Sequence, residues 1–182
     1  MLSQPFGLKN PETLPPRFWM FDRELTLYAF NLAYGKLLVA DVPDEQFAEQ
    51  PAEGFNHPAW VLGHLAAVSD FGLQVLGRPF ALPAEWHQLF DPGTVPSPER
   101  SLYPPKAELV AAYEAGHRRL AEAVAAGPDP ARLARPNAIR DLRPVLPTQG
   151  DFLAHILTTH EATHLGQLSA WRRQVGLPSV RG

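Results

Sequence analysis

The prolines of this chain restrict its possible folds more than any other feature of the sequence. There are 20 prolines in 182 residues, and they gather in a few short stretches instead of being scattered. A proline inside a helix removes a backbone hydrogen bond and clashes with the preceding turn, so long helices end where prolines gather. The intervals between these stretches therefore mark the parts of the chain that can form long helices.

Four such intervals repeat apolar residues every three or four positions, which is typical of helices with one buried face. The helices are expected over about 17–40, 58–76, 105–126 and 148–175. No strand-like alternation bounded by hairpin turns is visible. The sequence therefore predicts an all-α fold, a four-helix bundle with two long proline-rich connections over about 77–104 and 127–147.

Local signals refine the second and fourth helices. Pro58 suits the first turn of the second helix, with Asn56 or His57 as its cap. Thr148 and Asp151 form a capping box in its acidic form at the start of the fourth. The inward face predicted for the fourth helix consists of Phe152, Ile156, His160, Thr163, His164, Gln167 and Trp171.

Composition excludes several classes of protein. The net charge of -3 gives no basic surface for nucleic acid, and no uninterrupted apolar run approaches the roughly 20 residues of a membrane span. The chain has no cysteine, and its N-terminus lacks the basic start and apolar core of a signal peptide. We therefore expect a cytoplasmic protein that forms a single domain over 1–182, with its core at about 15–176.

Residues 160–164, HEATH, match the H-E-x-x-H pattern of zinc proteases. In those enzymes a third metal ligand normally follows further along the chain. Only LGQLSAWRRQVGLPSVRG follows His164 here, and it contains no histidine, aspartate or glutamate. A zincin-type protease is therefore disfavoured.

The geometry of the two histidines nevertheless suits a metal site. Four residues at about 100° each place His160 and His164 one turn apart on the same face of a helix. A third ligand from another helix would complete the set, and His64 lies on the predicted inward face of the second helix. The sequence therefore predicts a three-histidine site drawn from two helices, with one or more coordination positions open.

Two motifs carry a resemblance to a known family. Residues 56–65, NHPAWVLGHL, are similar to the second-helix motif of the DinB/YfiT-like proteins. Residues 160–168, HEATHLGQL, resemble the H-x-x-x-H-x-G-Q of that family's fourth helix. The resemblance extends over about 15–175, including the order of the helices and the two long connections.

The resemblance implies a four-helix bundle, often homodimeric, that holds a divalent metal such as zinc or nickel through His64, His160 and His164. Some relatives are thiol-dependent enzymes, including bacillithiol transferases and mycothiol-dependent maleylpyruvate isomerases. We therefore expect a metal-dependent transferase or hydrolase that acts on a small-molecule substrate, by thiol transfer or metal-assisted hydrolysis. Because the chain has no cysteine, a low-molecular-weight thiol would enter as cosubstrate. The alternative is a non-catalytic metal-binding or stress-associated protein.

Four further residues have expected roles. Glu161 could flank the metal, orient a ligand, face solvent or act as a general base, and Gln167 could donate to a ligand or substrate. His117 is expected at the boundary of the third helix's inward face. His155, five residues before His160, should lie about 140° away on a regular helix and should not share the metal.

Overall fold

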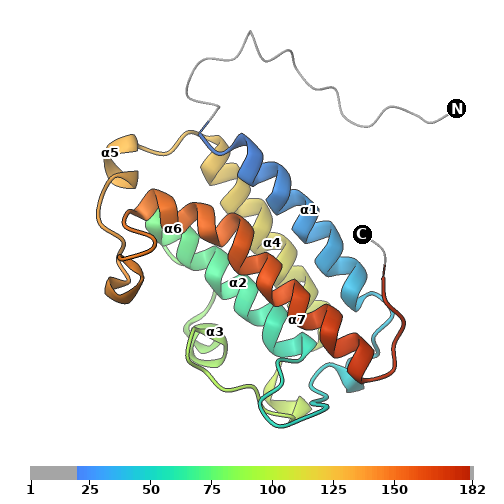
Figure 1. Ribbon diagram of the computed structural model, residues 1–182. Helices are drawn as coiled ribbons and strands as arrows, with labels where there is room; N and C mark the ends of the chain where they lie inside the picture. The colour runs from blue at the N-terminus through green and yellow to red at the C-terminus, as the bar shows by residue number, and fades with distance from the viewer. Residues whose placement is uncertain (1–19, 181–182) are drawn as a thin grey trace, which may run out of the picture.

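Four long helical segments run side by side through the part of the chain described by a computed structural model, residues 20–180 (Figure 1). They are α1 (Asp22–Val39), α2 (Pro58–Val75), α4 (Lys106–Ala125) and a fourth segment made of α6 (Gln149–His155), η6 (Ile156–His160) and α7 (Glu161–Gln174). No β-strand occurs within residues 20–180, where the nearest feature is an isolated bridge between Pro136 and Thr148. The all-α prediction is confirmed.

The first helix begins later than predicted. It starts at Asp22 rather than near residue 17, and Phe21 caps it without any side-chain hydrogen bond. Asp22 and Glu24 lie in its first turn, where negative charge is favourable beside the helix N-terminus. The part of the predicted helix at 17–19 lies outside the described residues.

The predicted caps of the other helices are present. His57 caps α2 by accepting a hydrogen bond from the backbone N–H of Trp60 at 3.2 Å, and Pro58 occupies the first helical position. Thr148 and Asp151 form the expected capping box at the start of α6. Each bond satisfies a backbone donor that has no partner inside its helix.

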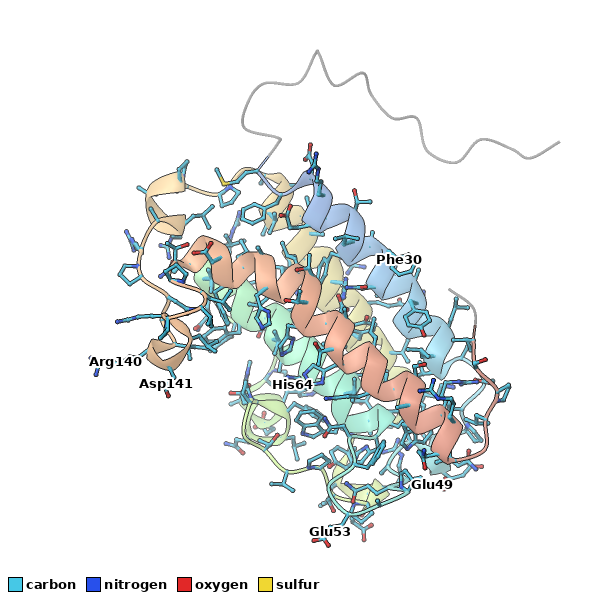
Figure 2. The ribbon with its side chains drawn as sticks, viewed as in Figure 1. Phe30, Glu49, Glu53, His64, Arg140 and Asp141 are labelled. Carbon is cyan, nitrogen blue, oxygen red and sulfur yellow. The ribbon has the colours of Figure 1, made fainter. Side chains whose placement is uncertain are left out.

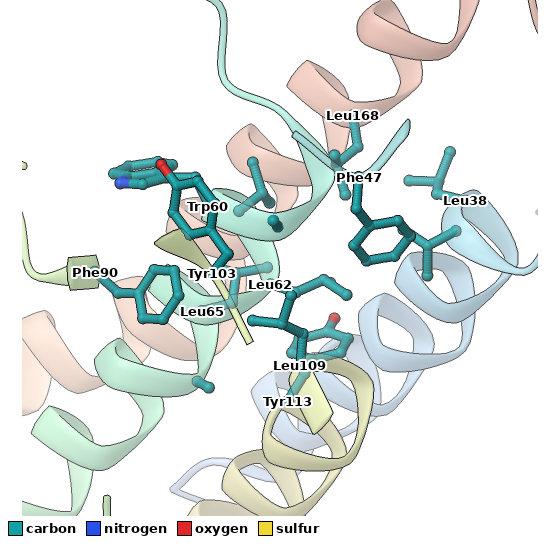
Figure 3. Close-up of a cluster of buried hydrophobic side chains, with 14 of the residues drawn as sticks. Leu38, Phe47, Trp60, Leu62, Leu65, Phe90, Tyr103, Leu109, Tyr113 and Leu168 are labelled. Carbon is teal, nitrogen blue, oxygen red and sulfur yellow. The ribbon is translucent and has the colours of Figure 1, made fainter. Parts of the chain in front are cut away.

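Helix α2 is the central element of the bundle. It is buried around nearly its whole circumference because α3 (Ala84–Phe90), α4 and the fourth segment all pack against it. Figure 3 shows Leu62 and Leu65 of α2 within a core cluster that includes Leu38 of α1 and Leu109 of α4. The helix that carries His64 is therefore fixed from several sides.

Both long connections contain short helical elements. The first carries α3 and η4 (Arg100–Leu102), and the second carries α5 (Pro130–Leu133) and η5 (Arg140–Leu142). A further short turn, η3 (Asp44–Gln46), follows α1. Helix α3 packs on α2 and α5 packs on α6, so the connections cover the bundle instead of looping away from it.

The fourth segment is not the regular helix that was predicted. Its middle, η6, is a π-helix, which contains one residue more per turn than the α-helix on either side. The extra residue moves each later inward position one place along the chain. The fully buried positions beyond it are accordingly Glu161, Leu165, Leu168 and Arg172, together with Trp171. Thr163, predicted to face inward, is exposed.

No helix within residues 20–180 combines the length and the apolar character that crossing a membrane requires.

Candidate metal centre

The structure brings together the three predicted histidines. His64 comes from α2, His160 from the end of η6 and His164 from the first turns of α7. Each offers one ring nitrogen, and the three nitrogens lie within 4.8 Å of one another. Figure 2 labels His64 in the middle of the bundle, where α2 passes beside α7.

Two of these histidines are held in the form that can bind a metal through Nε2. The Nδ1–H of His64 donates to the backbone carbonyl of Phe90 at 2.7 Å, and the Nδ1–H of His164 donates to Oε1 of Gln167 at 2.9 Å. Both partners can only accept, so each ring carries its proton on Nδ1 and keeps a lone pair on Nε2. Asn56 donates to the same oxygen of Gln167 at 2.8 Å and fixes that amide.

The surroundings keep the three rings neutral. Burial, together with the neighbouring His164 and His64, lowers the pKa of His160 to about 3. Burial and the nearby His64 lower the pKa of His164 to about 4, and burial also lowers the pKa of His64. Metal ions bind the neutral imidazole, so at neutral pH the three rings are in the form that a metal ion would require.

The donor set fits a divalent transition metal. Three neutral imidazole nitrogens suit zinc, nickel and similar ions, and no fourth protein ligand joins them among residues 20–180. His160 differs from the other two ligands, because its buried Nδ1 has no hydrogen-bond partner in the described chain.

The ring of Trp60 braces His64. The two rings stack almost parallel, with centroids 4.6 Å apart and planes 8° from each other. Trp60 Nε1 donates to Thr94 Oγ1 at 2.9 Å, so a hydrogen bond as well as stacking holds the indole in place. Gly63, next to His64 in the chain, leaves room for Phe90, since a Cβ atom there would lie 2.3 Å from the ring of Phe90.

A cavity of about 360 Å³ opens beside His160. Helices α2 and α6 and the π-helix form its apolar wall, while both long connections contribute to its rim. The lining residues are Ala67, Val68, Phe71, Asp91, Pro92, Ile139, Asp141, Leu142, Phe152, His155, Ile156 and His160. The cavity is thus mostly apolar, and His160 is one of the few polar groups that line it.

His155 lies closer to the site than predicted. The rings of His155 and His160 are 5.5 Å apart between centroids, and both line the cavity. The expected separation of about 140° assumed a regular helix, whereas residues five apart stack above one another in a π-helix. His155 is still not one of the three clustered ligands.

Glu161 and Gln167 have different surroundings. Gln167 lies beside His164 and accepts its hydrogen bond. Glu161 is buried in the core, where Oε1 accepts hydrogen bonds from the Tyr113 hydroxyl at 2.6 Å and from Nε2 of His117. His117 is accordingly buried and not at a boundary, and Glu161 is not among the residues that line the cavity.

Sequence reasoning missed two contributors to the site. The Phe90 carbonyl that holds His64 is a backbone atom in a connection, and no residue type in the sequence indicates it. Asn56, by contrast, begins the NHPAW motif, where the sequence suggests it only as a helix cap. Its polar side chain next to the cap was the available signal.

Comparison with known proteins indicates a family. The sequence profile described as the DinB superfamily matches residues 36–168, a range that includes all three histidines. No curated protein matches the chain.

Proposed function

The chain belongs to the DinB superfamily, and we propose that its three histidines hold a divalent metal ion for an enzyme acting on a small molecule. The observation that carries this proposal is the convergence of three ring nitrogens beside a mostly apolar cavity. Two of the three ligands already have an outer hydrogen bond that selects the metal-binding tautomer. Such outer partners are typical of functional metal sites.

The protein's own residues supply binding and orientation. Phe90 and Gln167 hold two of the ligand rings, and the apolar wall of the cavity would bind the body of a substrate. A divalent ion in this site would supply a Lewis acid that can polarise a substrate group or lower the pKa of a bound water or thiol. Asp91, Asp141 and His155 are the polar side chains other than His160 that line the cavity and could orient the substrate.

We propose two candidate reaction classes, transfer of a low-molecular-weight thiol, which the family resemblance suggests, and metal-assisted hydrolysis. The thiol must come from outside, because the chain contains no cysteine. The competing proposal is a non-catalytic metal-binding or stress-associated protein. The cavity favours the enzyme, since a site that serves only stability needs no opening toward a substrate.

The first test is the metal content of the untagged protein as purified, measured by mass spectrometry. We expect about one divalent ion per chain in the wild type and a sharp loss in His64→Ala, which removes one of three ligands. His155→Ala is the matched control, because His155 lines the cavity but is not in the ligand cluster, and it should keep its metal. No metal in the wild type, even after incubation with zinc or nickel, would refute the metalloenzyme.

We also propose that the chain forms a homodimer through the outer face of α1. Leu27, Phe30 and Leu37 follow one another at spacings of three and seven residues, so they share one side of the helix. Their side chains are 51%, 56% and 47% exposed, although large apolar residues are usually covered. Figure 2 marks Phe30 on this helix.

A further inference from the structure

No outer hydrogen bond within the described chain orients His160, whose Nε2 lies 3.3 Å from Nε2 of His64 inside the cluster. His64 and His164 each donate their Nδ1–H to a fixed acceptor, whereas Nδ1 of His160 is buried and has no partner among the described residues. A ring without an outer partner takes its direction from its backbone. The question is therefore what fixes the backbone at the end of the π-helix.

A hydrogen bond from a side chain of α1 contacts the backbone of the π-helix. Asn31 is buried, and its Nδ2 donates to the carbonyl of Thr158 at 3.4 Å. A π-helix leaves its backbone groups less regularly paired than an α-helix does, so side chains from neighbouring elements can stabilise it. This contact lies within the same helical turn as His160.

A stronger set of contacts holds the next residue. Tyr113 and His117, one turn apart on α4, both donate to Oε1 of Glu161. We call these three residues the Glu161 clamp. Tyr28 of α1 stacks on His117 with ring centroids 3.6 Å apart, and Gly35 leaves room for the Tyr113 hydroxyl, which would be 2.7 Å from a Cβ there.

A contribution to folding stability does not explain why Glu161 is buried in this clamp. Oε2 of Glu161 is buried and has no hydrogen-bond partner in the described chain. Leaving a polar atom in this condition costs about 1–3 kcal/mol, and an apolar side chain of similar shape would avoid that cost. A role for Glu161 that depends on its hydrogen bonds accounts better for its place in the core.

We propose that Glu161 is a positioning residue, whose clamp by Tyr113 and His117 fixes the direction in which His160 leaves the π-helix. The proposal rests on the three-histidine metal site proposed above. Adjacent residues of a helix have a fixed angle between them, so anchoring Glu161 in the core sets the direction of His160 toward His64 and His164. The glutamate of the H-E-x-x-H pattern then acts on a ligand through the backbone and does not meet the substrate.

The test compares the zinc affinity of three variants by competition with a chromophoric chelator. Tyr113→Phe removes one donor of the clamp and keeps the shape of the ring, and Glu161→Ala removes the acceptor. We expect zinc affinity to fall by about 10- to 100-fold in both, as for other outer partners of metal ligands. Tyr28→Phe is the matched control, since it loses a buried hydroxyl bonded to Ser69 and should bind zinc like the wild type.

Glu161→Gln separates the clamp from the charge of the carboxyl group. Its amide oxygen can still accept from Tyr113 and His117, so zinc affinity should stay within about threefold of wild type. An equal loss in Glu161→Gln and Glu161→Ala would overturn the proposal, and so would wild-type affinity in Tyr113→Phe.

A second measurement needs no metal. The measurement is the long-range ¹H–¹⁵N spectrum of the metal-free protein. The ¹⁵N chemical shifts of the His160 ring should change in Tyr113→Phe and should match the wild type in Tyr28→Phe. Unchanged His160 signals in Tyr113→Phe would refute the clamp. If the wild type bound no zinc, the proposed function would fail, but these spectra would still decide whether Glu161 positions His160.

Discussion

The buried histidines have the clearest consequences at the scale of single residues. Burial, as the main cause, lowers the pKa of His57 to about 4, that of His160 to about 3 and that of His164 to about 4. The ordinary value is 6.5, so between about pH 4 and 6.5 the unfolded chain binds more protons than the folded chain. The folded state without metal is therefore destabilised as the pH falls through this window.

We predict that the free energy of unfolding of the chelator-treated protein falls between pH 7 and pH 5. Each of these histidines can contribute up to about 1.4 kcal/mol per pH unit. Urea titrations at several pH values measure the slope, and His164→Asn should flatten it. Hydrogen bonds from Arg172 and Arg100 are the main cause that lowers the pKa values of Asp41 and Asp44 from 3.8. These carboxyl groups therefore change stability only below about pH 5 and do not contribute to the slope measured here. A stability that is constant from pH 7 to 5 would contradict the prediction.

At the scale of elements, the docking of α3 on α2 brings the end of α3 against His64. The ring of Phe90 fills the space above Gly63, and the carbonyl of the same residue accepts the hydrogen bond of His64. Phe90 is fully buried, so its ring has little room to move. The position of the carbonyl thus depends on the absence of a side chain at residue 63.

We predict that Gly63→Ala lowers zinc affinity by about 10-fold or more, because the displaced Phe90 no longer holds His64 in its metal-binding form. Overpacking should also cost about 1–3 kcal/mol of stability. Gly72→Ala is the matched control on the same helix, where a Cβ would lie 2.9 Å from Leu120, away from the histidines. It should lose stability and keep its affinity for zinc. Equal affinity in the two variants would contradict the role assigned to Phe90.

The sequence predicted these elements unequally well. The ends of α2 and α4 lie within a residue of the predicted ends, because proline and periodic apolar residues are local signals. The π-helix could not be predicted in this way. Its extra residue is compatible with the same apolar spacing. The contacts from α1 to the π-helix and from α4 to Glu161, the residue after it, are distant in the sequence.

At the scale of the whole molecule, the proposed homodimer depends on the exposed apolar side chains of the outer face of α1. We predict that Phe30→Glu halves the mass measured by light scattering, because a charge at the centre of the proposed interface would be buried without a partner. Leu102→Glu is the control, since Leu102 is 52% exposed in η4 and lies outside this face. A wild-type monomer, or a dimer unaffected by Phe30→Glu, would contradict the proposed interface.

The sequence by itself determined the all-α class, the order of the long helices and the choice of His64, His160 and His164 as candidate ligands. These conclusions follow from helical spacing, which is local, and from the family motifs. That the histidines meet is a separate finding, because it needs α2 and α7 to pack together.

Only the tertiary structure decided which way each side chain of the fourth segment points. In a regular helix, His160 would have faced the core in place of Glu161. His155 would have pointed about 140° away from His160. The inserted residue turned Glu161 inward and left His160 at the edge of the cavity. The physical reason is that helical phase accumulates along the chain. One added residue, stabilised from other helices, therefore redirects every position that follows it.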